Sequence, residues 1–351
     1  MALDIRPYTA DAVPAVREFN RRLLAGGAPA DQQFPESPDP GWMPGLELFL
    51  AMEGETVRGG YILRRQRFTV HGESIGAAHY RLPLSEGIVD RAYAMVALRL
   101  VRDALAREPR LYALGMGGWD RPLPQMLKSL KWRMSEVPFR FKVVRPGPFL
   151  RNIRVLRTNA VRRAALDLAA LTGAGWLGMK AAGIARRLPS QACDPVDSFG
   201  SWADDLWRSA HAAYGLVAKR DAATLRELYP ASDSRFFRVR AAGGWAVCLD
   251  TQMHDHKQFG DMRVGTIVDC FGPTDSAGKV MLAAASLLER RGVDLIVSNQ
   301  SHPAWIGGLT DAGCRGGPSN YLVALSPKLA EAAGEANMHF NRGDGDGPIH
   351  L

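Results

Sequence analysis

The sequence has few cysteines, and none of them are paired in a motif. The four cysteines, Cys193, Cys248, Cys270 and Cys314, are widely spaced, and no Cys-x-x-Cys occurs. Such spacing is typical of reduced thiols in a protein of the cytoplasm. Structural zinc ligands usually come in close pairs, which are missing here. We therefore expect buried, reduced thiols, a cytoplasmic location and no metal.

Other patterns that mark common functions are also missing. The first residues, Met1-Ala-Leu-Asp-Ile-Arg6, lack a basic start followed by an apolar core, so we expect no secretory signal peptide. The stretch between Arg163 and Lys180 is too short and too polar to span a bilayer. There is no P-loop and no Gly-x-Ser-x-Gly elbow, and the pair His254-Asp-His256 has no third metal ligand nearby. These absences disfavour nucleotide hydrolysis, the common hydrolase elbow and a metal centre.

Acidic residues are scarce in one segment of the chain. The formal net charge is +8, from 44 basic and 36 acidic residues. Nine basic residues lie between Arg145 and Arg187, and only Asp167 opposes them, so the rest of the chain is neutral. The excess is a local patch, and we do not expect nucleic acid as a general partner.

The second half of the chain repeats the pattern of the first half. Alternating strands and helices are predicted at 74–80, 89–106, 111–115, 122–132 and 139–144, and again at 264–271, 280–291, 294–299, 304–312 and 321–325. A chain of 351 residues is also long enough for two domains. We predict an α+β protein of two similar domains, each a mixed, mostly antiparallel sheet flanked by helices.

The predicted boundaries divide the chain into four parts. The two domains are expected at 1–150 and 196–330, joined by a basic helical connector at 151–195 and followed by an extended tail at 331–351. Residues 160–188 have a helical pattern that places Arg162, Lys180 and Arg187 on one face. Two interpretations of the connector remain open. It is a bridging helix between the domains, or it binds an anionic membrane surface and places the protein at the periphery of the inner membrane.

Three local features resemble the tandem form of the GNAT superfamily of acyl-CoA-dependent acyltransferases. They are the loop that opens a helix at 81–89, the strand, asparagine and helix at 294–312, and Ala312-Gly313-Cys314. Tandem members include the Fem-type aminoacyl transferases and paired domains of polysaccharide loci. Neither loop has the family's (Gln/Arg)-x-x-Gly-x-(Gly/Ala) pattern: they read Leu84-Ser-Glu-Gly-Ile-Val89 and Pro273-Thr-Asp-Ser-Ala-Gly-Lys279.

The resemblance implies an N-acyltransferase. The donor would be acyl-CoA or an acyl-carrier protein, and the acceptor an amine of a small molecule such as an amino sugar or polysaccharide precursor. Two alternatives stay open: a Fem-type transferase that uses aminoacyl-tRNA, and a non-catalytic module of the same fold. An aminoacyl-tRNA enzyme would contact phosphates through the basic connector.

The resemblance places donor binding in the first copy. Ser85 and Gly87 open a helix whose amides suit an anion, although Ser85 is equally a candidate for ordinary N-capping. The resemblance also points to a backbone contact with the pantetheine arm of the donor by five consecutive residues, Leu114, Gly115, Met116, Gly117 and Gly118. The alternative for these glycines is a turn that needs positive φ.

Acyl transfer to an amine also needs a base and an acid. His79 and Glu86 are the candidate bases of the first copy, although His79 also suits a hydrogen-bonded core histidine. In the second copy Asp269 and His302 are candidate bases and Tyr321 a candidate acid. Asn299, Gln300 and Trp305 are candidates for substrate binding, while capping of the following helix by Asn299 or Ser301 is the alternative.

Overall fold

The computed structural model describes residues 3–41, 45–172, 178, 191–335 and 337–345. These residues form two compact units, each assembled from segments that are distant in the sequence. The first unit consists of Met1–Phe68, Ser74–Ser135 and Leu322–Gly334, and the second of Thr69–Glu73, Glu136–Tyr321 and Glu335–Leu351.

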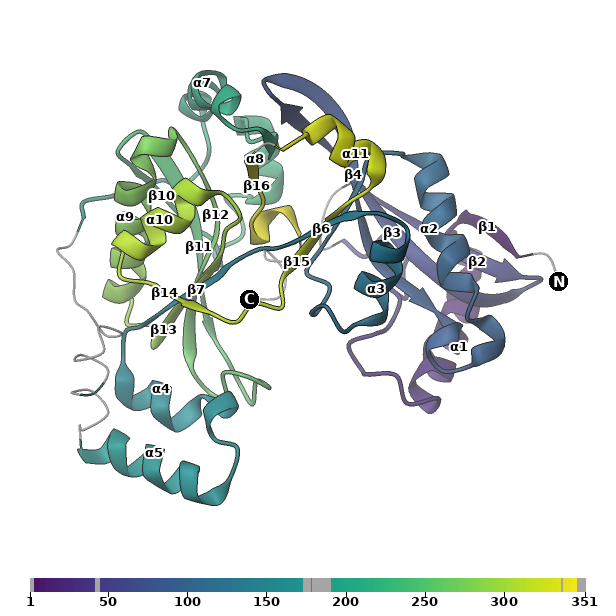
Figure 1. Ribbon diagram of the computed structural model, residues 1–351, viewed down its shortest axis with the longest axis horizontal. Helices are drawn as coiled ribbons and strands as arrows, with labels where there is room; N and C mark the ends of the chain where they lie inside the picture. Colours follow the sequence, from purple (N-terminus) through teal and green to yellow (C-terminus); the bar gives the residue numbers. More distant parts are fainter. Residues whose placement is uncertain (1–2, 42–44, 173–177, 179–190, 336, 346–351) are drawn as a thin grey trace. The chain divides into compact units, whose positions relative to one another are not determined.

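The first unit is built on a mixed sheet of strand order β1-β2-β3-β4-β5-β15-β6 (Figure 1). Its strands are β1 (Asp4–Pro7), β2 (Leu46–Glu53), β3 (Thr56–Val70), β4 (Glu73–Ser85), β5 (Leu111–Leu114), β6 (Arg133–Glu136) and β15 (Leu322–Leu325), and its helices are α1 (Val13–Ala25), α2 (Val96–Arg107), α3 (Pro122–Ser129) and α11 (Pro327–Ala333). The apolar side of α1 packs with Leu48, Leu50 and Ile62. Helices α2 and α3 pack with the alternate residues Phe49, Tyr61 and Leu63. Because side chains alternate along a strand, these helices cover opposite faces of the sheet.

The second unit has a sheet of order β8-β10-β11-β12-β13-β7-β14. Its strands are β7 (Phe139–Val143), β8 (Asp194–Pro195), β10 (Phe237–Ala241), β11 (Gly244–Gln252), β12 (Arg263–Phe271), β13 (Leu295–Asn299) and β14 (Arg315–Gly317). Two further short strands, β9 (Leu216–Ala218) and β16 (Met338–His339), pair in parallel and belong to the other sheet, in which β9 also pairs with β3. The helices are α4 (Pro146–Asn152), α5 (Ala160–Thr172), α7 (Ser201–Ala210), α8 (Ala222–Leu228), α9 (Ala277–Arg290) and α10 (Pro303–Asp311). Its core gathers around Trp245, Phe271 and Trp305.

The two sheets have the same strand order, as the repeated sequence pattern predicts. Strands β8, β10, β11, β12, β13, β7 and β14 take the places of β1, β2, β3, β4, β5, β15 and β6. In each unit the central pair is parallel, β4 with β5 and β12 with β13, and each pair is joined by a crossover helix, α2 or α9. The predicted α+β fold of two similar domains, each with a mixed, mostly antiparallel sheet flanked by helices, is confirmed.

The strands that end the two repeats are exchanged between the units. Strand β7 pairs with β13 over Leu295↔Val143 to Asn299↔Phe139, and β15 pairs with β5 over Val323↔Leu114 to Leu325↔Tyr112. Contiguous domains at 1–150 and 196–330 therefore differ from the observed units. The physical reason is that strands pair through backbone hydrogen bonds, so an apolar strand pattern does not identify the sheet that receives it.

The tail differs from its predicted form, whereas only part of the connector lies among the described residues. Helix α5 matches the start of the helix expected at 160–188, and Lys180 and Arg187 lie outside the described residues. The segment expected as an extended tail contains the end of α11, then β16 and a 3-10 turn, η7 (Arg342–Asp344), packed into the second unit. Buried polar contacts hold this segment in place, as described below. Within the described part of the chain, no helix has both the length and the apolar character needed to cross a bilayer.

Candidate active site

In the first unit, the parallel strands β4 and β5 separate toward their carboxyl ends. They pair at Ala78↔Leu111 and His79↔Tyr112. Strand β4 then continues to Ser85, whereas the amide of Gly115, which follows β5, donates to the carbonyl of Leu322 at 2.9 Å. Thus β5 follows β15 rather than β4 beyond this point. His79 stands at the last paired position, where the two strands begin to diverge.

His79 is buried, and its imidazole is neutral at physiological pH. The ring is 2% exposed and stacks on Tyr112 with centroids 4.8 Å apart and an interplanar angle of 5°. Burial, followed by the charges of Arg64 and Arg81, lowers the pKa of His79 well below 6.5. No hydrogen bond to this imidazole is found among the described residues. The ring is almost wholly buried and lines neither of the two hollows described below, so a core role and a role as base both stay predictions.

Arg64 and Arg81 were not recognised as site residues from the sequence. Both are buried, at 2% and 7% exposure, and both act electrostatically on His79. Arg81 lies two residues after His79 on β4, so their side chains share one face of the sheet. The alternation of His79 and Arg81 on β4 is the signal that could have identified Arg81, whereas Arg64 lies in the polar run Arg64-Arg-Gln-Arg67 of β3 and gives no such signal.

Glu86 is held in an ion-paired network that favours a structural role. Its carboxylate accepts from Arg22 at 2.7 Å and from Arg58 at 2.9 Å. Burial opposes ionisation of Glu86, but the bonds from the two arginines outweigh it and lower the pKa of the carboxyl. A carboxylate whose lone pairs are already taken by two guanidinium groups is a poor proton acceptor. Its contacts join α1, β3 and the turn after β4.

Ser85 and Gly87 also have local structural roles in the turn after β4. The Ser85 side chain accepts from the Gly87 amide at 3.1 Å and caps a 3-10 turn, η2 (Glu86–Ile88). A Cβ on Gly87 would lie 2.7 Å from the Tyr93 carbonyl oxygen, so glycine permits close packing of this loop. Helix α2 begins further along, after Met95, and has no side-chain cap.

The glycine-rich loop after β5 turns through positive φ. Gly115, Gly117 and Gly118 have φ of 73°, 82° and 113°. Such values favour glycine and account for its repeated use here. Leu114 ends β5 and is buried, while Met116 packs against the core formed with α2 and α3. The turn interpretation is thus sufficient for these glycines, and a contact with a donor remains a proposal.

In the second unit, the chain's own C-terminal segment occupies the space between the diverging strands. Strands β12 and β13 pair from Val264↔Leu295 to Ile267↔Ser298. Beyond this, the His339 imidazole bonds the Cys270 carbonyl at 2.8 Å on one side, and the Ser301 amide donates to the Phe340 carbonyl at 2.9 Å on the other. The segment Met338–Asp344 therefore lies between the ends of the two strands.

Asp269 belongs to the buried polar network that anchors this segment. Its carboxylate accepts from Arg220 at 2.9 Å, Tyr229 at 2.9 Å and the side-chain amide of Asn341 at 2.7 Å. Arg220 also pairs with Asp344 at 2.9 Å. Each oxygen of Asp269 is thus engaged, and this favours structural anchoring over the predicted role as a base.

The remaining candidates of the second unit are also engaged by neighbouring groups. The Asn299 side chain accepts from Arg342 at 3.0 Å and donates to the Val137 carbonyl at 3.2 Å, rather than capping a helix. Gln300 accepts from the Cys270 thiol, and the Trp305 indole donates to Tyr214 at 3.0 Å.

His302 and Tyr321 were predicted as a base and an acid. His302 is the N-cap of α10, where Nδ1 accepts from the Ala304 amide at 3.2 Å, and burial lowers its pKa. Tyr321 is half-buried and precedes β15, with the Arg342 guanidinium 5.5 Å from its ring centroid. The structure thus joins these second-unit candidates in packing and polar contacts rather than around an open space.

A hollow of about 390 Å³ lies where α9 and α10 begin in the second unit. It corresponds to the place of the predicted second loop, and Lys279 lines it. The carboxylates of Asp275 and Asp311 also line it, and their charges oppose the binding of a phosphate there. Asp275 does not cap α9, since Ser276 is the N-cap position of that helix. Among the described residues, no group of three His, Cys, Asp or Glu side chains is placed to hold a metal.

Comparison with known proteins identifies the fold. The sequence matches no protein-family model and no curated protein. The structure is similar to N-myristoyltransferase of Saccharomyces cerevisiae with bound myristoyl-CoA, with a TM-score of 0.53 at 9% identity, covering 93% of this chain and 78% of that one. A GCN5-related N-acetyltransferase from Anabaena variabilis gives a TM-score of 0.52 at 8% identity, covering 92% and 72%. A probable N-acyltransferase from Enterococcus faecalis gives 0.50 at 10%, covering 93% and 73%. The chain thus has the fold of GNAT-superfamily acyltransferases over nearly its full length.

Proposed function

We propose that this protein is an N-acyltransferase that moves an acyl group from acyl-CoA to an amine of a small molecule. The observation that carries the proposal is His79, a neutral imidazole without a hydrogen bond among the described residues, at the point where β4 and β5 separate. In a GNAT fold this separation is the expected path of a thioester arm. The three similar structures, all described as N-acyltransferases or N-acetyltransferases, agree with this class of activity.

The first unit is the proposed donor site because the second unit is unsuitable in two respects. Its strand separation is filled by Met338–Asp344, and the hollow at α9 carries two carboxylates. In the first unit, the uncapped amides at the start of α2 would receive the pyrophosphate. The loop from Leu114 to Gly118 would lie along the pantetheine arm. Since the Gly115 amide already bonds Leu322, the later amides of the loop are the ones left to contact it.

His79 is the proposed general base. A neutral imidazole accepts a proton from the amine, the amine nitrogen forms a bond to the thioester carbonyl carbon, and the carbon–sulfur bond breaks as the thiolate takes up a proton. Burial, followed by the charges of Arg64 and Arg81, lowers the pKa of His79, so the imidazole is in the neutral, accepting form at physiological pH.

For the donor and the acceptor we propose only a chemical class. A carrier protein or an aminoacyl-tRNA would present the same acyl carbonyl on a larger body, and an amino sugar or polysaccharide precursor would supply the amine. The second unit would then contribute to acceptor binding. The non-catalytic alternative is a module of the same fold that transfers no acyl group. Donor binding by the wild type would distinguish an enzyme from this module.

The test combines donor binding with turnover. Calorimetric titration with a panel of acyl-CoAs should show binding by the wild type, and release of free thiol in the presence of amines should report turnover. His79→Gln removes the base but keeps a side chain of similar size, so we expect a loss of roughly 10²–10⁴-fold in kcat with near-normal donor affinity. His302→Gln is the matched control, because that histidine caps α10 and should leave kcat nearly unchanged.

Two results would contradict the proposal. If His79→Gln turns over at the wild-type rate per folded molecule, His79 is not the base. If the wild type binds no acyl-CoA of the panel, the acyl-CoA assignment fails, and titration with acyl-carrier protein and aminoacyl-tRNA then separates the alternative donors from the non-catalytic module.

A further inference from the structure

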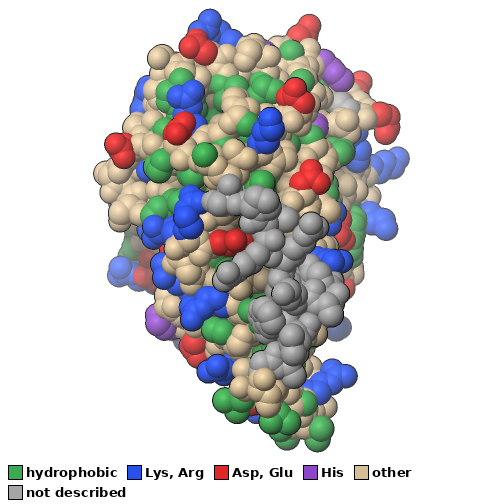
Figure 2. Space-filling model, turned by 90° about the vertical axis from the view of Figure 1, so that its left-hand side faces the viewer, with side chains coloured by type: hydrophobic (Ala, Val, Ile, Leu, Met, Phe, Trp, Pro, Cys, Tyr) green, Lys and Arg blue, Asp and Glu red, His purple; other side chains and the backbone are tan. Residues whose placement is uncertain are grey.

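The connector of the second unit carries an exposed apolar helix face. In α5 the side chains of Leu166, Ala169 and Ala170 pack against the core formed with α4. A second series, Val161, Ala164, Ala165, Leu168 and Leu171, follows helical spacing on the other side and is exposed. Val161, Leu168 and Leu171 are 79%, 62% and 76% exposed. Figure 2 shows hydrophobic side chains gathered at the lower tip of the molecule, where α5 lies.

Two more exposed aliphatic side chains lie beside this face. Val155 and Leu156 belong to η4 (Arg154–Leu156), the turn that joins α4 to α5, and are 62% and 45% exposed. Together, five large aliphatic side chains are open to solvent within 17 residues of the described chain. Single exposed leucines need no explanation, but a gathered group marks an interaction site.

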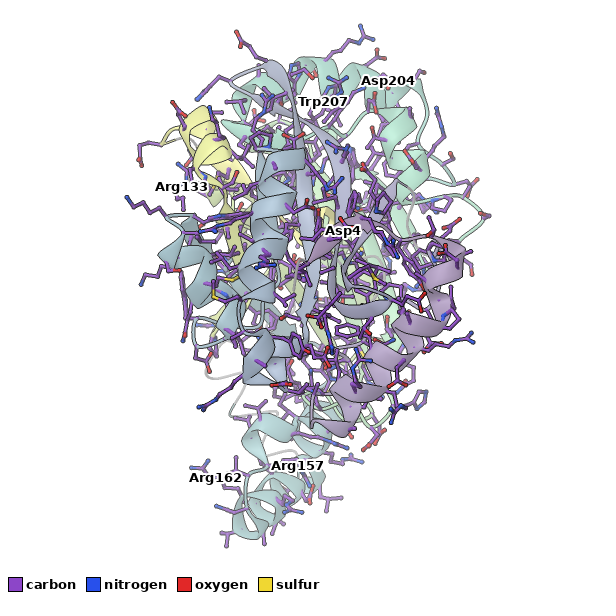
Figure 3. The ribbon with its side chains drawn as sticks, turned by 90° about the vertical axis from the view of Figure 1, so that its right-hand side faces the viewer. Asp4, Arg133, Arg157, Arg162, Asp204 and Trp207 are labelled. Carbon is purple, nitrogen blue, oxygen red and sulfur yellow. The ribbon has the colours of Figure 1, made fainter. Side chains whose placement is uncertain are left out.

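The same hairpin is strongly basic. Six arginines and one aspartate lie between positions 145 and 172. Arg151, Arg154, Arg162 and Arg163 are exposed, and Figure 3 shows Arg162 extending outward from α5. A hollow of about 410 Å³ is lined by Arg151, Arg154, Arg157 and Arg163, with Asn152, Gly260 and Asp261 completing it. Arg154 and Arg157 already pair with Asp255 and Asp167, and Asp261 lines the hollow, so its contribution to a basic surface comes from Arg151 and Arg163.

The surface formed by η4 and the outer face of α5, which we call the α5 surface, combines both features. We propose that it docks the protein on an anionic phospholipid membrane. Aliphatic side chains on a short exposed helix enter the boundary of the acyl chains, while arginines beside them contact the phosphates. Nucleic acid would use the arginines but leave Leu168 and Leu171 exposed, so the two features together favour a lipid surface. This proposal is independent of acyl transfer.

Vesicle co-sedimentation of the full chain tests the proposal without any donor or acceptor. We expect binding to phosphatidylcholine vesicles that contain about one-third phosphatidylglycerol, much weaker binding to phosphatidylcholine alone, and loss of binding as salt rises from about 50 mM to about 500 mM. Arg162→Gln/Arg163→Gln should weaken binding roughly 25-fold, since each basic residue near an anionic surface contributes about fivefold. Leu168→Gln/Leu171→Gln should weaken it roughly tenfold or more.

The matched controls are exposed residues of the first unit. Arg99→Gln/Arg102→Gln removes two charges from α2, and Leu24→Gln removes an exposed leucine from α1. Both should bind vesicles as the wild type does, and thermal melting confirms that all variants are folded. No binding to anionic vesicles, or equal loss in the controls, would overturn the proposal. If the wild type binds no vesicles but forms dimers that Leu168→Gln/Leu171→Gln converts to monomers, the α5 surface serves self-association instead. If the wild type binds no vesicles but binds RNA in a salt-sensitive way, the α5 surface binds nucleic acid instead.

Discussion

Replacing Arg220 with methionine should destabilise the second unit strongly. Arg220 is 1% exposed and pairs with Asp269 at 2.9 Å and with Asp344 at 2.9 Å, and it also donates to the Ala218 carbonyl at 2.9 Å. Methionine has a similar length but no charge, so two carboxylates that are themselves buried would lose their counter-ion. Breaking a buried pair in this way costs about 3–5 kcal/mol. A domain has only about 5–15 kcal/mol of stability, so much of it would be lost.

Urea unfolding followed by tryptophan fluorescence measures this effect, because Trp207, Trp245 and Trp305 all lie in the core of the second unit. Arg235→Met is the control, since Arg235 pairs with Asp233 but its side chain is 59% exposed. An exposed pair contributes only about 0–1 kcal/mol. Limited proteolysis should also cleave Met338–Asp344 faster in Arg220→Met, because the pair to Asp344 holds that segment.

The pH dependence gives a second check on the same variant. Burial raises the pKa of Asp344, while Arg220 opposes that rise. Without Arg220, the pKa of a carboxyl in this cluster rises further, and the folded state takes up a proton that the unfolded state releases. The destabilisation should therefore be smaller at about pH 5 than at about pH 8. Arg220→Met/Asp344→Asn should lose less than the sum of the single variants. If Arg220→Met costs no more than Arg235→Met at either pH, the network does not anchor the segment.

Three further predictions follow from particular contacts. Burial lowers the pKa values of His79, His302 and His339 below 6.5. The free energy of unfolding should therefore be highest above pH 6.5 and fall as the pH drops through that value, because the unfolded chain then binds protons that the folded state excludes. Urea midpoints across pH measure this, and His79→Gln should reduce the slope of the free energy of unfolding against pH by up to about 1.4 kcal/mol per pH unit. Gly87→Ala should cost about 1–3 kcal/mol, because its Cβ would lie 2.7 Å from the Tyr93 carbonyl oxygen, whereas Gly76→Ala, with no atom within 4 Å, should be nearly neutral in thermal melting. Lys142→Met should lower the free energy of unfolding by about 1–3 kcal/mol, because it removes the hydrogen bond to the Ala312 carbonyl and the ion pair with Glu289 that hold the exchanged strand β7. Lys128→Met, at an exposed lysine, is the control, and an equal loss of stability in it would contradict that role.

The periodic elements of this protein could be predicted from its sequence. Apolar spacing identified the strands at β4, β5, β12 and β13 and the crossover helices α2 and α9, because burial of one face imposes a regular pattern on a strand or helix. The repeated order of these elements also predicted two similar sheets. The arginine-rich connector was visible as well, since charge is a property of composition.

The tertiary structure decided which distant segments meet. The exchange of β7 and β15 could not be predicted, because backbone pairing leaves little trace in side-chain pattern. Glu86 appeared to be a candidate base until Arg22, 64 positions away, was found to hold its carboxylate. Likewise Asp269 meets Arg220, Asn341 and Asp344 only in the folded chain. Local sequence determines the form of each element, whereas the protonation and availability of a side chain depend on neighbours that only folding brings within hydrogen-bond distance.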